Sequence, residues 1–140
     1  MAVALLLAGY AVGRVSTGPV AAQTPAPAPA GHVYELRTYT AAEGKIANVN
    51  ARFRDHTRRI FEKHGMKNIG YWTPLEGPTA GTTLVYILEH QSREAARASW
   101  AAFRTDPDWL KAKAESETAG PIVAKVESVF LNPTDYSALK

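Results

Sequence analysis

Cysteine is absent from this chain of 140 residues. Without thiols, the protein cannot form a disulfide, a thiolate zinc site, an iron–sulfur cluster or a cysteine nucleophile. An excess of one charge is also missing, because 16 Lys and Arg against 13 Asp and Glu leave a net charge of only +3. Nucleic-acid binding normally requires a more concentrated positive surface. We therefore expect no nucleic-acid partner, and any chemistry must use other side chains.

A hydrophobic run long enough to span a membrane is also missing. The apolar stretch 2–13 is well short of the roughly 20 residues that a membrane-spanning helix needs, and small residues follow at 20–22. Small residues at this distance are typical of a signal-peptidase site. We predict a signal peptide at 1–22, export to the periplasm or the exterior, and no stable membrane span in the mature form. An uncleaved N-terminal anchor is the alternative.

The rest of the chain is predicted to form a spacer, one domain and a tail. Residues 23–31 alternate Pro with Ala, which favours an extended spacer. Residues 32–132 carry the pattern of a folded α+β domain, and 133–140 form a polar tail. Alternating or β-prone runs predict strands at 32–39, 66–73, 82–90 and 122–131.

Helices are predicted between these strands. Apolar residues at three- and four-residue steps predict an amphipathic helix over 45–64, which Gly65 can close. Ser92 and Asp106 are suited to cap two further helices. The order βαββαβ indicates a ferredoxin-like fold, a four-stranded antiparallel sheet with helices on one face.

The strand at 82–90 is apolar on both faces. Leu84, Tyr86 and Leu88 alternate with Val85 and Ile87. Because the helices cover only one face of the sheet, something else must cover the other. We therefore predict a homodimer formed by the sheet faces that turn away from the helices.

Two charged residues share one face of the first strand. Glu35 and Arg37 are two positions apart, and each is expected to be buried only if it is paired. They are interpreted as a cross-strand or interface ion pair, or as residues that set the register of the homodimer.

The histidines are considered singly. His56 lies between Phe53 and Ile60 on the expected sheet-facing side of the first helix, where it is either a pocket residue and candidate general base or a packed core residue. His64 is expected to have a structural role at the helix C-terminus, whereas His32 and His90 are expected to be solvated. Because the histidines do not cluster, no metal and no haem or other cofactor is predicted.

Aromatic residues provide the candidate ligand site. A pocket between sheet and helices would hold a small hydrophobic or aromatic molecule, although such side chains are often plain core. The basic run from Arg52 to Lys63 is interpreted as a solvated helix face. The predicted ligand-binding residues are Tyr34, His56, Trp72, Tyr86 and Trp100.

A set of short motifs, in this order and spacing, resembles the NIPSNAP domain over about 100 residues. The motifs are Tyr34-Glu35-Leu36-Arg37-Thr38-Tyr39, Gly44-Lys45, His56, Phe61-Glu62-Lys63-His64-Gly65-Met66, Gly70-Tyr71-Trp72, Leu84-Val85-Tyr86, and Trp100 through Phe103 to Asp106-Pro107-Asp108-Trp109.

The resemblance implies a dimeric α/β barrel, in which two ferredoxin-like sheets pair their open faces. It implies no catalytic residues, because the family pattern defines none. Two functions are therefore kept. One is the binding of a small hydrophobic molecule without turnover. The other is a cofactor-independent oxygenase- or isomerase-like enzyme, with His56 as base and Tyr34, Tyr86 or Trp72 positioning the substrate.

The predicted signal peptide leads to a test on the protein from its native host. We expect the intact mass to lack about the first 22 residues, because a signal peptidase would cleave after the small residues at 20–22. A soluble cytosolic form that retains Met1 would contradict export.

Overall fold

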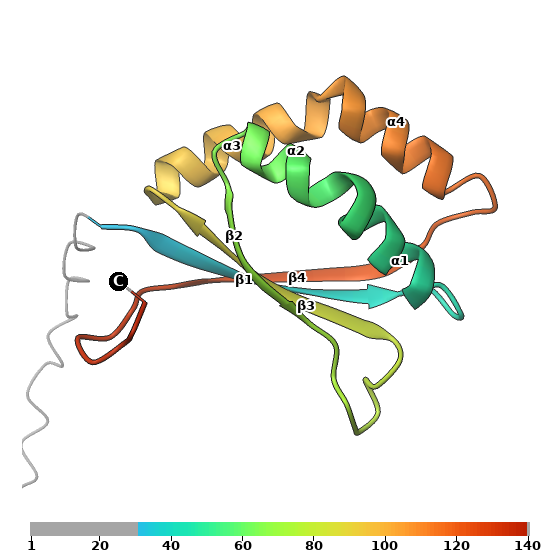
Figure 1. Ribbon diagram of the computed structural model, residues 1–140, viewed down its shortest axis with the longest axis horizontal. Coiled ribbons are helices and arrows are strands. Elements are labelled where there is room, and N and C mark those ends of the chain that lie inside the picture. Colours follow the sequence, from blue (N-terminus) through green and yellow to red (C-terminus); the bar gives the residue numbers. More distant parts are fainter. Residues whose placement is uncertain (1–30, 140) are drawn as a thin grey trace, which may run out of the picture.

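The computed structural model describes residues 31–139 of the chain. The predicted signal peptide and nearly all of the spacer lie outside these residues. The described part is an α+β domain with one sheet and one layer of helices (Figure 1). Its elements are β1 (Val33–Ala41), α1 (Ile46–Arg52), a π-helical segment η1 (Phe53–Thr57), α2 (Arg58–Lys63), β2 (Lys67–Trp72), β3 (Thr83–His90), α3 (Arg93–Thr105), α4 (Pro107–Ser116) and β4 (Val123–Leu131).

The sheet has the order β2-β3-β1-β4 and every neighbouring pair is antiparallel. This confirms the predicted four-stranded sheet of the ferredoxin-like fold, and all the helices lie on one face of it (Figure 1). Strand β1 is central, paired with β3 on one side and with the edge strand β4 on the other. Each side chain of β1 therefore has neighbours from β3 and from β4 on its own face of the sheet.

The two faces of the sheet have different neighbours. On β3, Leu84, Tyr86 and Leu88 are buried in the core beneath the helices. Their partners in register on β1 are Tyr39, Arg37 and Glu35, and paired residues share a face. Glu35 and Arg37 therefore face the helix layer, so the prediction that they set the register of an interface between open faces was wrong.

The predicted helix over 45–64 is present as α1, η1 and α2 in succession. Phe53, Ile60 and Phe61 are buried against the sheet. The π-helical turn at 53–57 widens the helix locally, and His56 there lines clefts with residues of α4 rather than with the sheet. The expectation that His56 faces the sheet is therefore not met.

The basic face of this helix is mostly exposed, as predicted, with one exception. Arg52 is buried. Its guanidinium donates to Glu117 at 2.8 Å and to Ser116 at 3.2 Å, and lies 5.1 Å from the centre of the Trp109 ring. Arg52 is buried because helix α4 packs over it and Glu117, directly after that helix, supplies the carboxylate.

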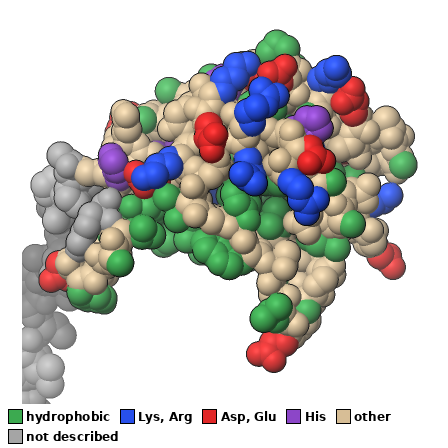
Figure 2. Space-filling view, viewed as in Figure 1, with side chains coloured by type: hydrophobic (Ala, Val, Ile, Leu, Met, Phe, Trp, Pro, Cys, Tyr) green, Lys and Arg blue, Asp and Glu red, His purple; other side chains and the backbone are tan. Residues whose placement is uncertain are grey.

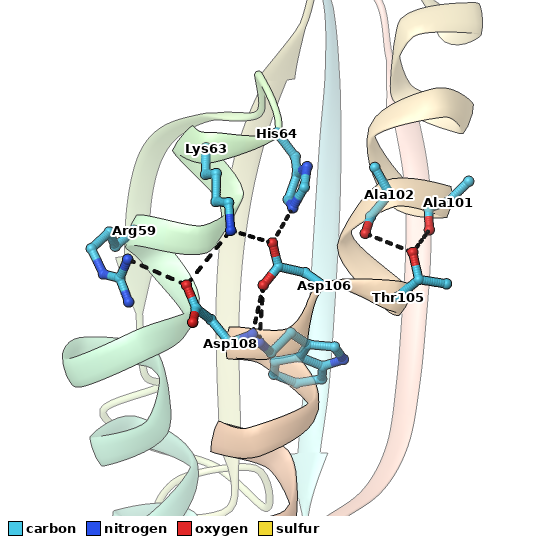
Figure 3. Close-up of polar contacts among 9 residues, drawn as sticks. Arg59, Lys63, His64, Ala101, Ala102, Thr105, Asp106 and Asp108 are labelled. Carbon is cyan, nitrogen blue, oxygen red and sulfur yellow. Dashed lines mark hydrogen bonds and ion pairs between the residues drawn. The ribbon is translucent and has the colours of Figure 1, made fainter.

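Asp106 joins the end of α2 to the start of α4 (Figure 3). One carboxylate oxygen accepts the backbone N–H groups of Asp108 and Trp109 and so caps α4, as predicted. The other contacts His64 Nε2 at 2.7 Å and Lys63 Nζ at 2.8 Å. The structural role predicted for His64 is therefore present, and its partner is this carboxylate.

Aromatic rings fill the space between the helices and the sheet. Phe61 lies at the centre, with the rings of Phe53, Tyr86, Trp100 and Phe103 between 4.9 and 6.1 Å from it, centre to centre. Of the four aromatic residues predicted to bind a ligand, Tyr86 therefore belongs to the core and Trp100 packs against it. Charged side chains gather over the helices and hydrophobic ones lie below them (Figure 2).

The opposite face of the sheet is partly open. Trp72 is 52% exposed and lies over Gly70, where an added Cβ would come within 2.5 Å of the indole ring. At the other end, residues 132–139 approach Tyr34 and Ile87 around a cleft of about 240 Å³. Within residues 31–139, no helix is long and apolar enough to cross a lipid bilayer.

Candidate functional site

A carboxylate lies in the middle of the sheet, beneath the helix layer. Strand β1 places Glu35 on the helix side, and the side chain is only 1% exposed. A buried carboxylate is expensive unless hydrogen bonds replace its lost hydration. Four side chains supply those bonds, one each from β1, β3, β4 and α3.

Each oxygen of Glu35 accepts two hydrogen bonds. Oε1 accepts from Arg37 and from the Ser128 hydroxyl, both at 2.6 Å. Oε2 accepts from the Trp100 indole at 2.7 Å and contacts His90 Nε2 at 2.9 Å. Strands β1, β3 and β4 and helix α3 are thus joined through one group.

These contacts determine the charge of Glu35. Burial alone would raise its pKa, but the hydrogen bonds from His90, Ser128, Trp100 and Arg37 outweigh burial and lower the pKa to about 2. Glu35 is therefore ionised at neutral pH and accepts a hydrogen bond from the Nε2–H group of His90. It is too weak a base to act as a proton acceptor at that pH.

Arg37 lies between this carboxylate and the solvent. Its side chain is 15% exposed, and its guanidinium carbon lies 4.1 Å from the centre of a Trp100 ring and 5.8 Å from that of Tyr39. Stacking on an aromatic face together with an ion pair fixes the plane of a guanidinium. Glu35 therefore holds both Arg37 and Trp100 in place.

A cleft of about 330 Å³ opens beside these two residues. Helix α3 contributes Arg97, Trp100 and Arg104, and Phe130 of the edge strand β4 forms another wall. The spacing of 97, 100 and 104 places these three side chains on one stripe of the helix. The cleft thus joins two aromatic rings to three guanidinium groups.

The five predicted ligand-binding residues do not converge. Trp100 lines this cleft, and Tyr86 lies nearby in the core, fully buried. Tyr34 and Trp72 belong to the opposite face, because their partners on β3 in register are Glu89 and Val85. His56 belongs to the π-helical turn and lines clefts with residues of α4. The structure therefore brings together only Trp100 and Tyr86.

The remaining histidines differ from expectation in one case. His32 is half exposed, as predicted, and pairs with Glu89 at 2.7 Å. The prediction that His90 is solvated was wrong, because it is 2% exposed. It stands at the end of β3 opposite Val33 of β1, with Nε2 against Glu35 and its ring centre 6.0 Å from that of Phe130.

Several residues of the site could not be identified from any local pattern in the sequence. His90, Ser128 and Phe130 reach Glu35 and the cleft only through strand pairing. The spacing of the arginines in 93–104 was the one local signal for the cleft. Among the described residues, no group of three His, Asp or Glu side chains is arranged to hold a metal ion.

The arrangement is suited to binding. A fixed guanidinium recognises a polar or anionic group, and the two rings contact an apolar body. The cleft is at the lower end of the size of small-molecule sites, roughly 300–1,000 Å³.

Comparison with known proteins identifies relatives of the whole domain. The sequence model of the NIPSNAP family matches residues 34–138. No curated protein is significantly similar in sequence.

Solved structures have the same fold. One is a NIPSNAP family protein of unknown function from Agrobacterium tumefaciens, 23% identical, with a TM-score of 0.69 over 80% of this chain and 96% of that one. A NIPSNAP-like domain protein from Burkholderia xenovorans is 18% identical, with a TM-score of 0.67 over 77% and 90%. SnoaB, a cofactor-independent oxygenase from Streptomyces nogalater, is 16% identical, with a TM-score of 0.51 over 79% and 100%.

The low pKa of Glu35 leads to a prediction for stability against pH. Because its pKa is about 2 in the folded protein and normally 4.5, the carboxylate stabilises the fold above pH 4.5. This contribution, about 3 kcal/mol, is lost as the pH falls through 2. Glu35→Gln should lower the free energy of unfolding at pH 7 by a similar amount and flatten its decline between pH 4.5 and 2, as urea unfolding would measure.

The control is Glu76→Gln, which changes an exposed carboxyl group. It should follow the wild-type pH profile. If Glu35→Gln declined with pH as steeply as the wild type, the ionised carboxylate would not be the stabilising group.

Proposed function

The chain belongs to the NIPSNAP family, and we propose that it binds a small aromatic molecule in the cleft between Trp100 and Phe130. The observation that carries the proposal is the fixed position of the cleft wall. Trp100 and Arg37 are both bonded to the buried carboxylate of Glu35, so their positions do not depend on a ligand. Binding to a wall that is already ordered costs little conformational entropy.

The opposite wall supports the same ligand class. Phe130 is partly exposed although it lies on the helix side of the sheet. Arg93 lies over it, with the guanidinium carbon 3.9 Å from the ring centre. An aromatic ligand between this ring and Trp100 would bury apolar area on both walls.

Titration with a neutral aromatic probe, 2-naphthol, tests the proposal. We expect chemical-shift changes at the Trp100 indole N–H, and Phe130→Ala should weaken binding roughly fivefold or more because it removes one aromatic wall. Val126→Ala is the matched control, since Val126 lies on the same face of β4 but does not line the cleft. Equal effects of the two variants would contradict the proposal, as would failure of 2-naphthol and of the charged naphthalenes alike to bind.

A second candidate function is cofactor-independent catalysis, the activity named for SnoaB. The observation that favours it is His90, whose Nδ1 is buried without a hydrogen-bond partner while Nε2 is held by Glu35. A histidine oriented by a carboxylate is a common form of general base. Its ring centre is 6.0 Å from that of Phe130 in the cleft wall. In this scheme His90, rather than His56, would take the proton.

We further propose that two copies associate through the open faces of their sheets, and that the exported mature protein meets its ligand outside the cytoplasm. The open face retains exposed apolar side chains on the two edge strands β2 and β4. An antiparallel sheet can leave a polar face in water, but a contiguous exposed apolar patch is typical of an association surface. Those side chains include Trp72, Val129 and Leu131.

The homodimer is tested by a charge on each face of one strand. Val129 is 55% exposed on the open face, and Val126 is 43% exposed on the helix face of the same strand. Val129→Glu should give a monomer in multi-angle light scattering at micromolar concentration, because the charge would be buried unpaired in the interface. Val126→Glu should remain a dimer. A folded wild-type protein with the monomer mass would refute the assembly.

A further inference from the structure

We infer that the molecule bound in this cleft is an aromatic oxyanion, and that Arg97 and Arg104 select it together with Arg37. The inference rests on the proposed function, because it names the class of ligand for the same cleft. The shared chemistry is a negatively charged oxygen group, carboxylate or phosphate ester, carried by a planar ring.

The first argument is the balance of charge. The residues that line the cleft include three arginines and no acidic residue. The buried carboxylate of Glu35 is neutralised by Arg37 at 2.6 Å, so it does not offset the other two. Arg97 has only an exposed partner, Glu94. Within residues 31–139, Arg104 has no carboxylate within ion-pair distance.

A fourth arginine adds to this surplus. Arg93 lies over the ring of Phe130 and, in the described part of the chain, pairs with no acidic side chain. Positions 93, 97, 100 and 104 follow one stripe of α3. The cleft is therefore bordered along its length by guanidinium groups, with Trp100 among them.

The second argument is the state of Arg37. Its guanidinium is held in one plane by Glu35 and Trp100, and its side chain remains 15% exposed beside the cleft. A planar, oriented guanidinium is suited to bidentate recognition of a carboxylate or phosphate. Burial strengthens such a contact relative to one in water. Glu35 is thus a positioning residue for the site.

The third argument is how the groups are arranged. Arg97 is largely exposed, so it is free to change rotamer, whereas Arg37 is fixed. The rings of Trp100 and Phe130 stand beside the guanidinium groups in the same cleft. A ligand with a ring and an adjoining oxyanion would therefore contact both kinds of wall at once. A neutral ring would leave the surplus positive charge without a counterion.

Calorimetric titration with four probes tests the inference. The probes are 2-naphthoate, its neutral analogue 2-naphthamide, 2-naphthyl phosphate and inorganic phosphate. We expect 2-naphthoate or 2-naphthyl phosphate to bind roughly tenfold more tightly than the amide. Whichever of these two probes binds more tightly shows whether the negative group of the ligand is a carboxylate or a phosphate ester.

The variant Arg97→Gln/Arg104→Gln should reduce this preference roughly threefold, because Arg37 remains, and should leave binding of the amide unchanged. Both side chains are exposed, so the variant is expected to fold. Arg59→Gln is the matched control, because Arg59 is equally exposed and has only a 3.7 Å ion pair outside the cleft. Binding of the anionic probes should also weaken with added salt.

The outcomes separate the two proposals. Binding of the amide as tightly as both 2-naphthoate and 2-naphthyl phosphate would overturn the inference and leave the aromatic site intact. Inorganic phosphate binding as tightly as the preferred anionic naphthalene probe would show that the ring contributes nothing and would overturn the inference. Failure of every naphthalene probe to bind would refute the proposed function itself. A preference unaffected by the double variant would place the selecting charge elsewhere and overturn the role of Arg97 and Arg104.

Discussion

The buried carboxylate of Glu35 is the constraint on which the middle of this structure depends. An ion in this position is tolerated only when its oxygens are fully satisfied. Here the donors come from β1, β3, β4 and α3, so the strand pairings and the placement of α3 must all be correct together. The same contacts fix Arg37 and Trp100 at the edge of the cleft. Stability and the shape of the site therefore depend on the same contacts.

The helix layer is held by a second carboxylate with a different task. Asp106 caps α4 and contacts the last residues of α2. It fixes how the helices meet, whereas Glu35 fixes how a helix meets the sheet. Between them lies the aromatic core around Phe61. Packing between these rings has little directional preference. The hydrogen bonds of Glu35 and Asp106 at its borders therefore specify how the helices and the sheet fit together.

The fold could be predicted from local patterns, and the site could not. Alternation along 82–90 and the caps at Ser92 and Asp106 are local features, and they were sufficient for the element order. The role of His90 depends on its lying opposite β1 and next to Phe130, which no window of sequence contains. His56 was misplaced because helical periodicity assumes a regular helix, and the π-helical turn at 53–57 breaks that assumption. Arg52 was assigned to solvent because its acidic partner, Glu117, is 65 residues away.

Strand β1 carries two sets of side chains that alternate along it. Glu35 and Arg37 face the helices, while Tyr34 and Leu36 face the open side of the sheet. An insertion or deletion of one residue within this strand would exchange the two sets, exposing the carboxylate and moving tyrosine and leucine beneath the helices. Homologous chains should therefore keep the length of β1, whereas the loop between β2 and β3 is free to lengthen or shorten.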